Sequence, residues 1–120
     1  MLFRELNWHA LLRVSRAEKV NRLLKQLEEI CGQPVTLLTC ERYWKDSGLF
    51  DVSFTTPLNE VTPADAVFQA LVTARNLAFD WHVSGPSITG DNQWEFRGLT
   101  TKTQITGIEW IQFHMDSVDG

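Results

Sequence analysis

The sequence predicts an α+β domain in which an antiparallel sheet carries two helices on one of its faces. Two stretches, residues 15–32 and 62–78, repeat apolar side chains every three to four positions, which is typical of helices with one buried face. The segments around them alternate apolar and polar side chains, which is typical of strands. Of the 120 residues, 43% are hydrophobic and 22% are charged, so we expect a single domain over residues 1–120.

The N-terminal part of the chain predicts a strand followed by the clearest helix. Residues 6–14 place an apolar side chain at every second position, so one face of this strand is expected to be buried. The helix over residues 15–32 is expected to begin at Ser15, with Glu18 completing a capping box three positions later. Gly32 is expected to end the helix in the left-handed conformation.

Two strands joined by a turn are expected after the first helix. Residues 35–44, rich in β-branched and aromatic side chains, predict the second strand, and residues 49–56 predict the third. Residues 45–48 between them have the composition of a turn. Pro57 is expected to end the third strand, because proline has no N–H to donate to a sheet.

The second helix and a fourth strand follow. Thr62 is a favourable N-cap and Pro63 suits the first helical position, so both residues predict where the helix over residues 62–78 begins. Residues 79–83 alternate large apolar with polar side chains and predict a strand. Gly85-Pro86 is expected to stop that strand.

The C-terminal part predicts two more strands. Residues 90–92 are expected to form the tip of a hairpin, and residues 93–99 and 108–115 are expected to form strands. Residues 100–107 are a polar, threonine-rich connection, and residues 116–120 are expected to form a loose tail.

The first six elements have the βαββαβ order of a ferredoxin-like fold, with the last two strands as a C-terminal pair. Right-handed crossovers would put both helices on one face of the sheet and leave the other face open. In that arrangement the first and fourth strands are neighbours. The alternative is a sheet that the two extra strands curl toward a partial barrel.

Three histidines are expected on the open face of this sheet. Alternation directs His9, His82 and His114 away from the large apolar side chains of their strands. With the first and fourth strands adjacent, His9 and His82 would lie close together, with Asp80 nearby. Such a cluster would suit a metal site or a general base. Ordinary half-exposed histidines are the favoured alternative, because metal ligands usually stand at close spacing in sequence. We therefore expect no metal and no cofactor.

Several chemistries lack their sequence signatures in this chain. No glycine-rich phosphate loop precedes either helix, no serine or cysteine stands in a nucleophile motif, and Cys31 and Cys40 match neither a metal knuckle nor a disulfide framework. The third strand, LFDVSFTT, lacks the basic and aromatic signature of an RNA-recognition module. We therefore expect no catalytic residue of these classes and no RNA binding.

The charge distribution narrows the class of partner. The formal charge is −4, and residues 61–120 hold three basic and seven acidic side chains, whereas residues 1–60 hold eight of each. An acidic surface disfavours nucleic acid and membranes and suits a basic partner. No apolar run approaches the roughly 18 residues that span a bilayer, and the N-terminus lacks a secretory core, so a cytoplasmic location is expected.

In size, acidity and tryptophan content, with five tryptophans and no catalytic motif, the chain is similar to small cytoplasmic immunity proteins that bacteria keep beside a secreted toxin. The resemblance implies a protein inhibitor that binds a cognate basic toxin, such as a nuclease. Immunity proteins share no universal motif, so the contact residues are chosen for charge and aromatic character instead. They are Asp80, Asp91, Trp94, Glu95, Glu109 and Trp110.

A second function from another class stays open. The element order and the histidines and aromatics of the open face are also similar to dimeric α+β barrels, which bind or transform small ligands between two sheets. The sequence leaves monomer and dimer undecided. A basic stripe on the first helix, including Lys19 and Arg22, would bind phosphate or would simply be a solvated helix face.

Overall fold

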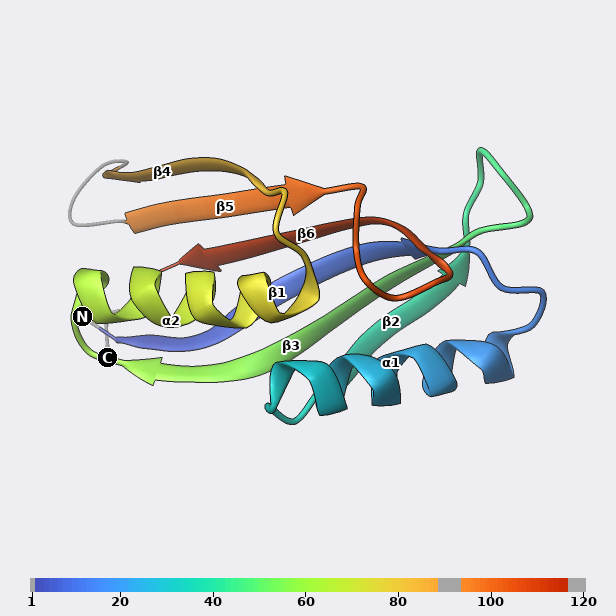
Figure 1. The fold of residues 1–120 in the computed structure, drawn as a ribbon, viewed down its shortest axis with the longest axis horizontal. Helices are drawn as coiled ribbons and strands as arrows, with labels where there is room; N and C mark the ends of the chain where they lie inside the picture. Colours follow the sequence, from blue (N-terminus) through green and yellow to red (C-terminus); the bar gives the residue numbers. More distant parts are fainter. Residues whose placement is uncertain (1, 89–93, 117–120) are drawn as a thin grey trace.

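The structure, a computed structural model, describes residues 2–88 and 94–116, and the side chains of Ile88 and Asp116 are outside the description. Within these residues, two helices lie on one antiparallel sheet of six strands (Figure 1). In chain order the elements are β1 (Phe3–Leu12), α1 (Ala17–Cys31), β2 (Thr36–Arg42), β3 (Phe50–Glu60), α2 (Pro63–Leu77), β4 (His82–Ile88), β5 (Trp94–Thr100) and β6 (Ile108–Asp116). The α+β class and the antiparallel sheet are confirmed.

The strand order is β2-β3-β1-β6-β5-β4, and every neighbouring pair is antiparallel. It differs from the expected ferredoxin-like order, because β6 rather than β4 lies beside β1. The last three strands form a meander, and β6, which carries the fully buried Ile111, Phe113 and Met115, lies beside β1 in the middle of the six-stranded sheet. Strand β4 contains Gly85 and Pro86 and lies at the sheet edge, where a missing N–H is tolerated.

The two helices differ in how they begin. The capping box expected at Ser15 is wrong: the helix begins at Ala17, and its N-cap is Arg16, which has an extended backbone and makes no side-chain capping bond. Gly32 does end α1 in the left-handed conformation, with φ of 69°. In α2, the predicted cap is confirmed, because the Thr62 hydroxyl accepts a hydrogen bond from the Asp65 N–H at 3.2 Å.

Two strands extend past the residues expected to stop them. Strand β3 continues through Pro57 to Glu60. Its neighbour β2 reaches only as far as the pair of Thr36 with Thr55, so β3 has no partner on that side beyond this point and tolerates the missing N–H. Strand β4 begins at His82, later than predicted, and continues past Gly85-Pro86 with an irregular register. The hairpin tip at 90–92 and the tail residues 117–120 lie outside the described residues.

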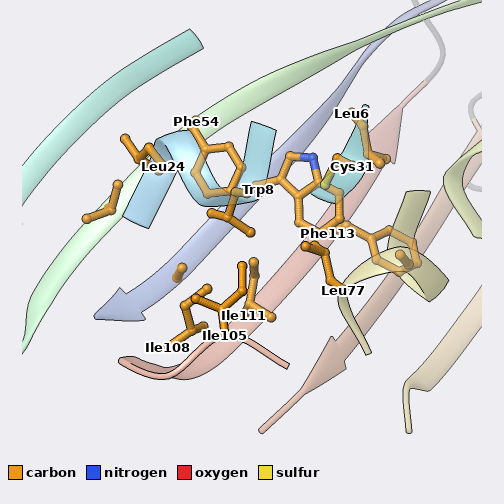
Figure 2. Close-up of a cluster of buried hydrophobic side chains, with 14 of the residues drawn as sticks. Leu6, Trp8, Leu24, Cys31, Phe54, Leu77, Ile105, Ile108, Ile111 and Phe113 are labelled. Atoms are coloured by element: carbon orange, nitrogen blue, oxygen red, sulfur yellow. The ribbon is translucent and has the colours of Figure 1, made fainter. Parts of the chain in front are cut away.

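The hydrophobic core lies between the sheet and the two helices, which both cover the same face (Figure 1). Its centre is Trp8, whose ring stacks on Phe54 and meets Phe113 edge-on, each at a centroid distance of 5.8 Å (Figure 2). The Trp8 Nε1–H donates to the Thr56 hydroxyl at 2.9 Å, so its one polar atom is satisfied.

The connection between β5 and β6 closes the core between the helices (Figure 1). Ile105 in this connection is buried, and the Gln104 N–H donates to the Leu77 carbonyl at the end of α2, at 2.9 Å. No helix in the described part of the chain is long and apolar enough to cross a membrane. With one face of the sheet closed by helices and connection, the opposite face remains as a candidate surface for function.

Candidate functional site

The open face of the sheet carries the side chains that alternate with the buried core positions. On β1, for example, Trp8 and Ala10 are buried, whereas Asn7 and His9 between and beside them are half-buried. The same alternation runs through β3, β5 and β6. The open-face side chains of these four strands include Asn7, His9, Leu11, Asp51, Ser53, Glu95, Arg97, Trp110, Gln112 and His114.

The middle of this face is hollowed. A hollow of about 520 Å³ lies over β1 and its neighbours, with both polar and apolar groups in its walls and the exposed Leu38 at one side. Strand register explains its walls: Asn7 stands opposite His114, and His114 stands opposite Arg97, so three neighbouring strands present one row of polar side chains. The volume is within the range of about 300–1,000 Å³ typical of small-molecule sites. The polar residues around the hollow are Asn7, His9, Ser53, Arg97, Gln112 and His114.

His9 is held on two sides. Its Nε2 atom contacts a carboxylate oxygen of Asp51, and its ring meets Trp110 edge-on at a centroid distance of 5.1 Å. The side chains of His9 and Asp51 are 43% and 35% exposed, so solvent or a ligand reaches both. A carboxylate beside an imidazole orients the ring, and an accessible imidazole suits anion binding or proton transfer.

Arg97 provides the permanent positive charge of the hollow. Its guanidinium forms an ion pair with Glu95, two residues earlier on β5. His114 Nε2 lies 4.0 Å from the same Glu95 carboxylate. Three side chains that carry or can acquire positive charge therefore surround the hollow, with acidic neighbours that are themselves accessible. Arginine forks and imidazole N–H groups match the oxygens of carboxylates and phosphates.

The expected meeting of His9 with His82 is wrong. His9 stands opposite Gln112, Gln112 opposite Leu99, and Leu99 opposite His82. Three inter-strand spacings, roughly 14 Å, thus separate the two histidines. The cause is the place of β4 at the sheet edge. Among residues 2–88 and 94–116, no three histidine, cysteine, aspartate or glutamate side chains are grouped so that they could hold a metal ion.

The predicted partner contacts are spread over the molecule. Trp110 and Glu95 lie on the open face, and Trp94 is half-buried at the start of β5, near Pro63 and Pro86. Asp80 precedes β4 and its carboxylate lies 3.1 Å from Lys102 Nζ. Glu109 at the start of β6 pairs with Arg13. Asp91 lies outside the described residues. In the described part of the chain, Asp80, Glu95 and Glu109 each have a basic neighbour of their own.

An ion cluster at the end of β1 was not predicted from the sequence. The guanidinium of Arg13 binds Glu109 and, at 2.9 Å, Asp46 from the β2–β3 turn. Hydrogen bonds from Arg13 lower the pKa of both carboxylates, and those carboxylates raise the pKa of Arg13. All three side chains are nearly half exposed, so solvent screens the cluster. It joins a turn to two strand ends.

Some of the residues that line the hollow could be predicted from the sequence and others could not. Alternation alone places Asn7, Arg97 and Gln112 on the open face, beside the histidines that were singled out there. The role of Asp51 needed the register of β1 against β3, which a single sequence does not contain. Comparison of the chain with family models, curated proteins and solved structures finds no match.

Proposed function

We propose that this protein is a binding module that takes a small anionic ligand, with a carboxylate or phosphate group, in the hollow of its open sheet face. The observation that carries this proposal is the convergence of Arg97, His114 and His9 on one hollow of about 520 Å³. It favours the small-ligand function that the sequence left open as an alternative. The cationic groups would bind the anionic oxygens, and the amides of Asn7 and Gln112 would orient the remainder.

The neighbouring acids define how binding would proceed. Without ligand, Glu95 neutralises Arg97 and Asp51 contacts His9. An anionic ligand would compete with Glu95 for the Arg97 guanidinium. The ligand gains affinity over Glu95 if two of its oxygens bind the guanidinium at once, whereas Glu95 makes a single contact. Because the hollow is open to solvent on one side, bound ligands keep part of their hydration, and we expect moderate affinity.

A screen of thermal stability tests this proposal. Matched small molecules that differ only in charge, such as a carboxylate, its amide and the corresponding amine, are added to the wild-type protein and to Arg97→Gln. We expect the anionic members alone to raise the melting temperature of the wild type, because a ligand that binds only the folded state stabilises it. Arg97→Gln should abolish the effect, and Arg22→Gln on α1 is the matched control that should keep it. No anion-dependent shift would refute the proposal.

A protein inhibitor of the immunity type is the second candidate. Its support is the half-buried Trp110 on the open face, beside the formal charge of −4. Asp80, Asp91, Trp94, Glu95 and Glu109 remain candidate contacts under this proposal. Co-purification from the native host should then recover a basic toxin, and Trp110→Ala should weaken the complex by more than about 2 kcal/mol.

Arg97 separates the two candidates. The positive charge of Arg97 would repel a basic toxin, so Arg97→Gln would leave a toxin complex intact or strengthen it. The same variant would no longer bind a small anion. A host extract that yields no basic partner would remove the inhibitor proposal. The cytoplasmic location expected from the sequence remains a prediction under both candidates.

A further inference from the structure

Helix α2 exposes apolar side chains on its outer face, away from the sheet. Phe68 is 62% exposed, Leu71 and Val72 are about 40% exposed, and Phe79 directly after the helix is 76% exposed. The side chains on its inner face are buried in the core; they include Ala66, Ala70, Ala74 and Leu77. A helix that is apolar on both faces is typical of a buried helix, so something is expected to cover this one. Helix α1 has no such outer face: apart from Ala17 and Ile30 its exposed positions are polar.

The outer face of α2 has a symmetric sequence. Its central stripe consists of Asp65, Phe68, Val72 and Arg75, which follow each other in steps of three and four. The stripe is symmetric about position 70 and combines two matched pairs, Phe68 with Val72 and Asp65 with Arg75, while Val61 before the helix and Phe79 after it stand at equal distances in sequence from position 70. All six side chains are exposed. Steps of four and three are the spacing with which two helices pack side by side.

We propose that a second copy of this chain covers the face, with its α2 packed antiparallel across a two-fold axis that passes at the level of Ala70. In that arrangement every residue of the stripe meets its counterpart in the other copy. Asp65 of each copy meets Arg75 of the other, and Phe68 of each copy meets Val72 of the other. The interface is self-complementary, as a two-fold dimer requires.

The charges select this orientation over the parallel one. A parallel pair would set Asp65 against Asp65 and Arg75 against Arg75, and like charges in contact disfavour a complex. Among the described residues, Arg75 forms no ion pair within its own chain, so its charge is available to a second copy. Asp65 keeps its local bond to the Thr62 hydroxyl and has a second carboxylate oxygen to offer.

A hollow beside α2 fits the same arrangement. It measures about 380 Å³ and lies along the C-terminal half of the helix, lined in part by Val72, Arg75 and Phe79. Because Phe68 of the second copy lies against Val72, its ring would enter this hollow, and the symmetric contact would fill the hollow of the other copy. Buried aromatic side chains in pockets supply most of the affinity of protein interfaces.

The dimer is independent of the ligand proposal. It uses the helical face, so both open sheet faces point outward and stay accessible. A single helix pair buries an area at the low end of specific interfaces, below about 1,200 Å² in total, so we expect association that depends on concentration in the micromolar range.

Sedimentation equilibrium tests the proposal. The protein concentration is varied from about 5 to 500 μM, which covers the association expected for an interface of this size. The expected mass rises from 13.8 kDa toward twice that value. Phe68→Asp should hold the protein at the monomer mass, and Arg75→Glu should weaken association at least tenfold. The charge exchange Asp65→Lys with Arg75→Glu should restore association, because it recreates the same pair with reversed signs. Circular dichroism checks that each variant keeps its helices.

Trp44→Ser is the matched control, because Trp44 is 81% exposed but lies in the β2–β3 turn, away from α2. It should leave the association unchanged. Monomer mass over the whole series would overturn the proposal. So would a dimer that survives Phe68→Asp, since the contact would then lie elsewhere, or a charge exchange that fails to restore a dimer lost in Arg75→Glu.

Discussion

His9 of β1 contacts Asp51 of β3 across the open face, although the two residues are not opposite each other in the sheet. His9 stands opposite Ser53, and Asp51 stands opposite Leu11, so the contact is diagonal. Diagonal neighbours on one face of an antiparallel pair are within reach of long side chains. The contact holds the imidazole at the wall of the hollow, where Trp110 borders it on the other side.

The buried hydrogen bond between Trp8 and Thr56 gives the first prediction. Thr56→Val keeps the side-chain shape and leaves the Trp8 Nε1–H buried without its acceptor, so we expect a loss of about 1–3 kcal/mol in the free energy of unfolding. Urea denaturation measures it. Thr39→Val on the exposed edge strand β2 is the control and should change stability by less than about 0.5 kcal/mol. Equal effects of the two variants would contradict the role of the bond.

The close packing of Gly98 against Phe113 gives the second prediction. A methyl group added at Gly98 would lie 2.7 Å from Cζ of the Phe113 ring, in a fully packed part of the core. Gly98→Ala should therefore cost about 1–3 kcal/mol by overpacking. In a Phe113→Leu background the same change should cost less, because the smaller side chain makes room. A double-mutant cycle with no coupling would show that the two side chains do not compete for this space.

The Arg13 cluster gives a pH dependence. Arg13 lowers the pKa of Asp46 and of Glu109 from their ordinary values of 3.8 and 4.5. Carboxylates with lowered pKa values stabilise the fold above their unfolded pKa values, and this contribution is lost as the pH falls through the folded ones. The difference in melting temperature between wild type and Arg13→Gln should therefore be largest near neutral pH and shrink below about pH 4.5. The difference should also shrink in high salt. A difference in melting temperature that stays the same at every pH and salt concentration would contradict an ionic role for Arg13.

The two cysteines should differ in reactivity. Burial raises the pKa of the Cys31 thiol to about 12, and it also raises the pKa of Cys40, which is only half-buried on β2. The thiolate is the reactive form, so iodoacetamide near pH 8 should modify Cys40 first and leave Cys31 intact until the protein unfolds. Mass spectrometry of peptides follows both sites. Modification of both at one rate in native protein would contradict the burial of Cys31.

Local features of the fold could be predicted from the sequence, because their causes lie within a few residues. The Thr62 cap, Pro63 at the first turn and the left-handed Gly32 are examples. The absent cap at Ser15 shows the limit: β1 turns into α1 through an extended Arg16, and the Arg13 N–H is bonded to the distant Gly107 carbonyl. That contact depends on the β5–β6 connection, 94 residues later in the chain.

The candidate site could be predicted only in part, for a similar reason. Alternation placed His9 and His114 on the open face, but which strands are neighbours depends on pairing energies between distant segments. Since β6 took the place expected for β4, His82 lies apart and Arg97 joins the hollow instead. Which residues surround the hollow thus depends more on the order of the strands in the sheet than on the alternation within each strand.

The most direct test of the central claim is an NMR titration with inorganic phosphate that follows the imidazole and backbone signals. We expect saturable shifts at His9, His114 and Arg97, and their loss in Arg97→Gln. The competing anion site is the hollow beside α1, of about 520 Å³, which Lys19 and Arg22 line. Shifts confined to that hollow, or no saturable shift on β1, β5 and β6, would contradict the proposal that the open sheet face is an anion-binding site.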